Sequence, residues 1–113
     1  MFVSQSQTTS IGDVEMNNRF NDENTDLLFK AVLELRDYEE CCNFFEDLCT
    51  VTELKSISQR IRVAKMLRDK CVYSDIVKAT GASTATISRV NRSLQYGSNG
   101  YEALFQRIEA KDE

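Results

Sequence analysis

Apolar residues recur at the three- and four-residue spacing of a helix from about residue 25 onward. One apolar face predicts a first helix over residues 25–36, and it is formed by Leu27, Leu28, Ala31, Val32 and Leu35. Residues 37–49 predict a second helix, with apolar side chains around more of its circumference than one stripe needs: Tyr38, Cys41, Cys42, Phe44, Phe45, Leu48 and Cys49. We therefore expect the second helix to be buried on more than one side, as in a dimer interface.

A helix start signal follows directly in the run Thr50-Val51-Thr52-Glu53. The hydroxyl of Thr50 can accept from the amide of Glu53, while the carboxylate of Glu53 can reach back to the amide of Thr50. Apolar residues then repeat at helical spacing to about residue 68, uninterrupted by proline or glycine: Leu54, Ile57, Ile61, Ala64 and Leu67. The pattern predicts a long third helix.

The stretch from about Tyr73 to Tyr96 has the pattern of a helix-turn-helix. Gly81 stands where a short helix must reverse and positive φ is favoured, and Ser83 is a good N-cap for the next helix. Four apolar residues can close a small core between the two helices: Ile76, Ala82, Ile87 and Val90. Glycines at 97 and 100 then mark a stop and restart before a short final helix.

The second helix of this motif divides into sectors, because residues three, four and seven apart share a face. Ile87, Val90 and Leu94 form a core stripe, and a small, polar sector lies apart from it. Small side chains there let the backbone approach base edges in the major groove. With the preceding helix and turn, the predicted DNA-binding residues are Ser74, Lys78, Ser83, Thr84, Ala85, Ser88 and Arg92. The alternatives are a helical hairpin with a glycine turn, or a motif used only for protein contacts.

The N-terminal part of the chain has a different character. Residues 1–24 are rich in polar side chains, with too few apolar ones to form a face, and predict a flexible tail before a helical domain over residues 25–111. Met16 is an alternative start to Met1. No apolar run is long enough to cross a bilayer and the N-terminus does not resemble a secretory signal, so we expect a soluble, cytoplasmic protein without membrane contact.

Charge is distributed unevenly along the chain. The net charge is −4, yet residues 50–95 carry nine basic and three acidic side chains, which gives that segment +6 and the remainder −10. A basic segment is the electrostatic footprint of phosphate binding. The alternative is a solvated helical face with ordinary charge asymmetry.

Catalysis and metal binding have little support in the composition. The chain has no histidine, which removes the commonest general base and the partner of most nucleophiles. The four cysteines are not spaced as zinc ligands, and we expect buried, reduced thiols: Cys41, Cys42, Cys49 and Cys71. We predict a protein that is not an enzyme and carries no cofactor.

Three stretches resemble the tryptophan repressor superfamily, and more closely its YerC/YecD type: Thr50-Val51-Thr52-Glu53, Ser58-Gln59-Arg60-Ile61-Arg62-Val63, and Thr80 to Arg89 followed by Ser93-Leu94. The resemblance covers roughly residues 25–111. It implies an all-α fold with six helices per chain, an interlocked homodimer built from the first three helices and the last, and operator binding by the helix-turn-helix.

The resemblance also implies a corepressor pocket, and the positions that match it in kind are Thr50, Arg60, Thr86, Arg89 and Ser93. Two arginines there could bind the carboxylate of an amino acid or another small anion. The alternative role for Arg60 and Arg89 is phosphate contact or surface ion pairing. Val90 stands where the family has a glycine, and Asp47 where it has an apolar residue, so L-tryptophan is not the expected ligand and the corepressor is unidentified.

These observations predict a dimeric, sequence-specific transcriptional regulator acting as a repressor on double-stranded DNA. The alternative is a helix-turn-helix module that contacts other proteins and does not bind DNA.

Overall fold

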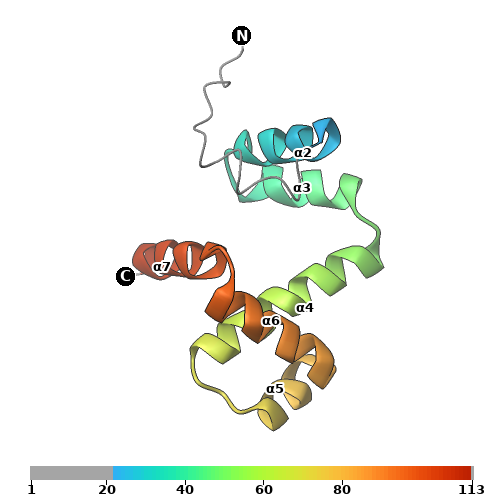
Figure 1. Cartoon of the computed structure of the whole chain (residues 1–113). Helices are drawn as coiled ribbons and strands as arrows, with labels where there is room; N and C mark the ends of the chain where they lie inside the picture. The colour runs from blue at the N-terminus through green and yellow to red at the C-terminus, as the bar shows by residue number, and fades with distance from the viewer. Residues whose placement is uncertain (1–21, 113) are drawn as a thin grey trace. The chain divides into compact units, whose positions relative to one another are not determined.

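The computed structural model describes residues 22–112, and the regular structure within that range consists of six α-helices (Figure 1). In chain order these are α2 (Glu23–Leu33), α3 (Tyr38–Leu48), α4 (Val51–Arg68), α5 (Tyr73–Thr80), α6 (Thr84–Tyr96) and α7 (Gly100–Asp112). The all-α prediction with six helices is confirmed. Residues 1–21 of the predicted tail lie outside the described range.

Side-chain caps fix where several helices begin. The carboxylate of Asp22 accepts from the amide of Thr25 at 2.7 Å, so α2 begins two residues before the predicted start. At α4 the predicted capping box is present: the amide of Glu53 donates to the Thr50 hydroxyl at 3.0 Å, and the amide of Thr50 donates to the Glu53 carboxylate at 2.9 Å.

The chain divides into two compact units, residues 1–45 and residues 46–113. The first contains α2 and most of α3, and neither helix has a buried residue. Leu33 is 82% exposed and Tyr38 is 85% exposed. The expected burial of the second helix on more than one side is therefore absent in the single chain.

The cysteine prediction is wrong with respect to burial. Cys42 is exposed, and Cys41, Cys49 and Cys71 are only half-buried. The reason for the two on α3 is that this helix buries no side chain within one chain. All four thiols are free.

The second unit has a small apolar core where α4, α5, α6 and α7 meet. The four residues predicted to close the helix-turn-helix are all buried, which confirms that prediction, and they join Val63, Ala64 and Phe105. The apolar stripe of α4 is only partly used. Ala64 is buried and Leu67 packs against the core, whereas Leu54, Ile57 and Ile61 are 37%, 44% and 48% exposed.

The link between α6 and α7 depends on a glycine. The amide of Gly97 donates to the carbonyl of Ser93 at 2.9 Å, and a Cβ on Gly97 would lie 2.4 Å from that oxygen. A side chain at this position would have to displace the backbone. The α7 helix then packs on the core through Phe105, whose ring stacks with that of Tyr101 at 6.1 Å. Within residues 22–112, no helix is long and apolar enough to cross a bilayer.

Candidate nucleic-acid interface

A network of hydrogen bonds fixes the turn between α5 and α6. Gly81 has φ of 74°, as predicted for the reversal, and its amide donates to the carbonyl of Val77 at 2.8 Å. The Thr80 hydroxyl donates to the carbonyl of Ile76 at 2.7 Å and accepts from the amide of Ala82 at 3.1 Å. One side chain thus ties the end of α5 to the residue that leads into α6.

The predicted N-cap of α6 is also present. The Ser83 hydroxyl accepts from the amide of Thr86 at 3.1 Å and donates to the Thr86 hydroxyl at 3.1 Å. The first of these contacts satisfies one of the free amides at the start of α6. The first turn of α6 contains no acidic residue that would repel a phosphate.

All seven predicted DNA-binding residues are exposed. Ser74 and Lys78 lie on α5, Ser83 caps α6, and Thr84, Ala85, Ser88 and Arg92 lie on α6. The core stripe of α6 is turned away from them, since Ile87 is fully buried and Val90 is 2% exposed. The structure therefore places the small, polar sector on the outer surface of the helix-turn-helix.

The nine basic residues of the basic segment fall into two groups. Lys65 and Arg68 pair with acidic side chains. The other seven form no ion pair with any residue in the range 22–112: Lys55, Arg60, Arg62, Lys70, Lys78, Arg89 and Arg92. Seven of the nine cations are therefore without an acidic partner among the described residues.

Arg68 fastens α7 to α4. Its Nε and Nη2 donate to the two carboxylate oxygens of Glu102 at 2.7 and 3.0 Å, its Nη1 donates to Glu109, and its guanidinium lies 5.8 Å from the centre of the Phe105 ring. Lys65 reaches Asp69 at 2.9 Å and Glu109 at 3.5 Å. The hydrogen bonds from Arg68 lower the pKa of Glu102 and Glu109 below its ordinary value of 4.5.

Replacing Arg68 by methionine should make the stability of the second unit less sensitive to acid. The lowered pKa values mean that the two carboxylates stabilise the fold above pH 4.5, and that this contribution is lost as the pH falls through their folded pKa values. Thermal unfolding followed by circular dichroism should show a lower midpoint for Arg68→Met at neutral pH. The difference from wild type should shrink in acid.

The matched control is Arg107→Met, because Arg107 lies exposed on α7 and pairs with no acidic residue between 22 and 112. We expect its unfolding midpoint to follow wild type at every pH. A gap between Arg68→Met and wild type that stayed constant into acid would mean that Arg68 acts only through packing on Phe105.

The residues predicted to hold a ligand lie at the start of α4, within α4 and along α6. Thr50 and Thr86 are engaged in the caps of α4 and α6. Arg60 and Arg89 are exposed. Ser93 borders a small cavity of about 140 Å³ together with Leu94, Asn99, Tyr101 and Glu102.

Val90 has a different environment from the one its family position suggests. Its side chain is 2% exposed and belongs to the apolar core with Val63 and Ile87. The methyl groups therefore fill the space between α6 and its neighbours, rather than lining an open slot.

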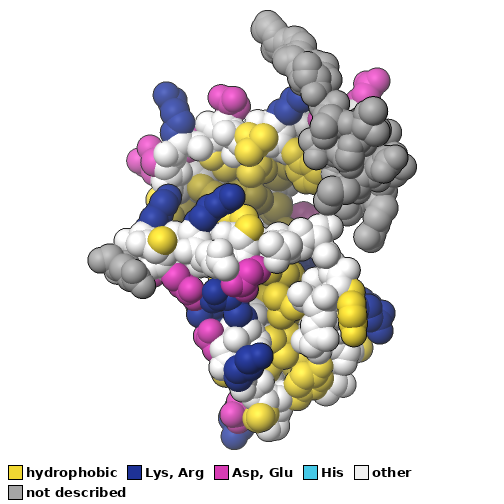
Figure 2. Space-filling view, turned by 60° about the vertical axis from the view of Figure 1, so that its left-hand side comes forward, with side chains coloured by type: hydrophobic (Ala, Val, Ile, Leu, Met, Phe, Trp, Pro, Cys, Tyr) yellow, Lys and Arg dark blue, Asp and Glu magenta, His cyan; other side chains and the backbone are white. Residues whose placement is uncertain are grey.

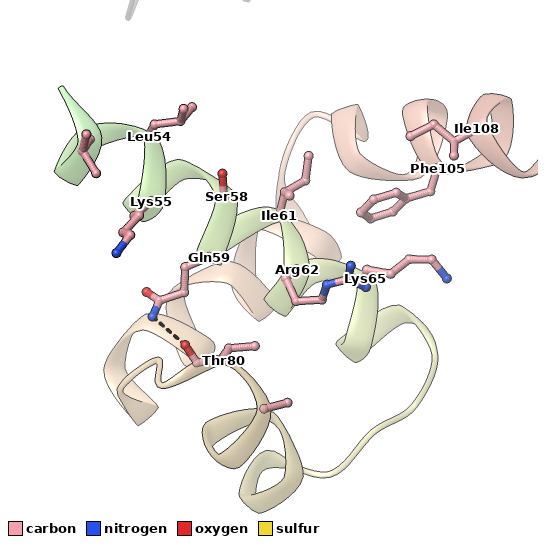
Figure 3. A pocket seen from close by; sticks show the side chains of 12 residues that line it. Leu54, Lys55, Ser58, Gln59, Ile61, Arg62, Lys65, Thr80, Phe105 and Ile108 are labelled. Carbon is pink, nitrogen blue, oxygen red and sulfur yellow. Dashed lines mark hydrogen bonds between the residues drawn. The ribbon is translucent and has the colours of Figure 1, made fainter. Parts of the chain in front are cut away.

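A larger hollow, here called the α4 groove, was not predicted from the sequence. It has a volume of about 920 Å³ and combines apolar side chains with cationic ones (Figure 3). Its lining residues are Val51, Leu54, Lys55, Ser58, Gln59, Ile61, Arg62, Lys65, Ala79, Thr80, Phe105 and Ile108. None of the five predicted ligand residues lines it. The signal in the sequence was the apolar stripe of α4, which is longer than a four-helix core can cover.

Together the turn, the capped second helix and the four-helix core define a helix-turn-helix protein. The family model described as "Trp repressor protein" matches residues 23–109. The chain therefore belongs to the Trp repressor family.

Relatives agree with this assignment. The chain is 53% identical over 83 residues to "Uncharacterized protein YerC" of Bacillus subtilis (strain 168), covering 74% of this chain and 80% of that protein. It is similar in structure to "a TrpR like protein from Eubacterium eligens ATCC 27750", with a TM-score of 0.77 and 54% identity over 82% of this chain and 96% of the other. A Staphylococcus aureus structure gives a TM-score of 0.77 and 47% identity, with 82% and 93% covered.

Proposed function

We propose that this protein is a sequence-specific DNA-binding transcriptional regulator that acts as a repressor in the cytoplasm. The observation that carries the proposal is the outer face of the helix-turn-helix, where all seven predicted contact residues are exposed on a turn fixed by hydrogen bonds. Membership of the Trp repressor family supports a DNA-binding regulator.

The two ends of this face have different roles in the proposal. Thr84, Ala85 and Ser88 lie toward the N-terminal end of α6, where short side chains let the helix enter the major groove and meet base edges. Lys78 and Arg92 carry unpaired charges at its flanks and contact phosphates. Affinity then comes mainly from phosphate contacts, and specificity from bases.

Direct titration of double-stranded DNA tests this proposal. Genomic fragments labelled with a fluorophore should bind the full chain at low salt, and the affinity should fall steeply as salt rises, because phosphate contacts release counterions. If the folded protein binds no genomic DNA even at low salt, the proposal is wrong. The protein would then be a helix-turn-helix module that contacts other proteins.

We also propose that the regulator is a homodimer whose second copy covers the α4 groove. Hydrophobic side chains reach the surface over wide areas (Figure 2), and α2 and α3 bury none of theirs in the single chain. Residues 22–48 carry nine acidic and two basic side chains, whereas the groove presents Lys55 and Arg62, which form no ion pair with any residue in the range 22–112. An acidic, amphipathic pair of helices from a second copy complements this groove in both polarity and charge.

The ligand proposal is a small anion or amino acid other than L-tryptophan, held by Arg60 and Arg89. Val90 occupies core space, so an aromatic ring pressed against it would have to displace α6.

Calorimetry with L-tryptophan should therefore show no saturable heat at millimolar concentration, and the amino acid should leave DNA affinity unchanged. The affinity for L-tryptophan should be about tenfold or more lower than that of a site with an open slot. A clear isotherm in the micromolar range would show that α6 moves to admit the ring.

A further inference from the structure

One hydrogen bond joins the long helix α4 to the helix-turn-helix. The Nε2 of Gln59 donates to the backbone carbonyl of Thr80 at 3.1 Å (Figure 3). The two residues are 21 positions apart in the chain and both are half-buried. Between residues 22 and 112, no other hydrogen bond connects α4 to residues 73–96.

The acceptor is placed where it controls the turn. Thr80 is the last residue of α5, so its carbonyl is among the four at a helix end that have no partner within the helix. Its own hydroxyl bonds to Ile76 on one side and Ala82 on the other. The Gln59 amide therefore holds the residue on which both arms of the turn converge.

Apolar packing alone would leave the orientation of the turn between α5 and α6 less well defined than a hydrogen bond does. The contacts of Ile76, Ile87 and Val90 with α4 hold α5 and α6 against it, but burial of apolar surface is non-directional. A hydrogen bond has a preferred distance and angle. Gln59 thus supplies a directional restraint at Thr80, which lies three residues before Ser83, the cap of α6.

We propose that Gln59 is a positioning residue for DNA reading: its bond to Thr80 sets the entry of α6 into the major groove. This inference rests on the proposed function. Gln59 and Thr80 also line the α4 groove, so a second copy seated there excludes water from the bond and strengthens it. Binding of the second copy in the α4 groove is thereby linked to the position of α6.

The test compares Gln59→Leu with wild type on two DNA fragments, one selected by the wild-type protein and one unrelated. Leucine keeps the size and apolar character of the side chain but cannot donate. We expect affinity for the selected fragment to fall about fivefold or more, the order expected when a half-buried carbonyl loses its partner. Affinity for the unrelated fragment should hardly change, because backbone contacts tolerate a small shift of α6.

Two further variants separate positioning from folding. Gln106→Leu is the matched control, because Gln106 donates to Glu102 within α7, away from the turn, and this variant should bind both fragments as wild type does. Gln59→Lys restores a donor, and the ratio of the two affinities should recover, since its added charge strengthens binding to both fragments alike. Gln59→Ala takes the place of the leucine variant if circular dichroism shows the latter to be unfolded.

The outcomes distinguish this inference from the function on which it rests. A wild-type protein that binds no DNA overturns the proposed function. A wild-type protein that discriminates between the fragments while Gln59→Leu discriminates equally well overturns only the positioning role. Equal losses on both fragments, without recovery by Gln59→Lys, would show that Gln59 merely supports the fold.

Discussion

Replacement of Leu54 by aspartate is expected to convert the proposed dimer into monomers and to abolish tight DNA binding. Leu54 is 37% exposed in the single chain and lines the α4 groove. In the proposed dimer a second copy covers it, so an aspartate there becomes a buried, unpaired charge. Such a charge costs several kcal/mol, which weakens association about a hundredfold or more.

The substitution should leave the monomer folded. Leu54 lies in the first turn of α4, where a negative charge interacts favourably with the helix dipole. Ser56→Asp is the matched control, since Ser56 is exposed on the same helix and does not line the groove. Sedimentation at micromolar concentration should show monomers for Leu54→Asp, and dimers for wild type and control. A Leu54→Asp variant that stays dimeric would place the interface elsewhere.

Replacement of Arg92 by alanine is expected to weaken binding to every DNA sequence, with a loss on the order of tenfold at low salt. Arg92 is exposed on the outer sector of α6 and forms no ion pair with another residue of the range 22–112. Its guanidinium is therefore available to a phosphate. Removing one such contact should reduce the slope of log affinity against log salt by about one unit.

The control is Arg107→Ala, which removes the same charge from α7 and so changes the net charge equally. It should leave the salt slope unchanged. Equal effects of the two variants would mean that Arg92 acts only through the overall charge of the protein. An Arg92→Ala variant with the affinity and salt slope of the wild type would show that α6 does not dock on DNA as proposed.

Local signals in the sequence were enough to predict the helices and the turn. The capping pair Thr50 and Glu53, the glycine at position 81 and the cap at Ser83 each act within four residues, so their spacing reveals their role. The start of α2 was missed by two residues although a signal existed: Asp22 stands three residues before Thr25, as an N-cap does.

The features that were missed depend on residues far apart in the chain. Arg68 meets Glu102 and Glu109 across separations of 34 and 41 residues, so counting charges by segment left Arg68 among the free cations. The hydrogen bond between Gln59 and Thr80 joins residues 21 positions apart, so the helical periodicity of the sequence could not predict it.

Burial likewise depends on residues far apart in the chain, so the sequence predicts it only in part. The stripe of α4 shows which side chains share a face, but only the fold shows that Leu54 and Ile61 border a groove while Ala64 lies in the core. The helical spacing of Val90 predicted a core position and the structure confirms it, whereas the family resemblance alone suggested that this position lines a ligand slot.

Selection from a random library tests most directly whether α6 reads DNA sequence. Double-stranded fragments retained by the full chain are sequenced, with Ser88→Ala selected in parallel because Ser88 lies on the outer sector of α6. Wild type should enrich one motif with two related half-sites about one helical turn apart, as expected for a dimer, and the variant should shift its base preference. Retained fragments with no shared motif would contradict sequence-specific reading by this helix.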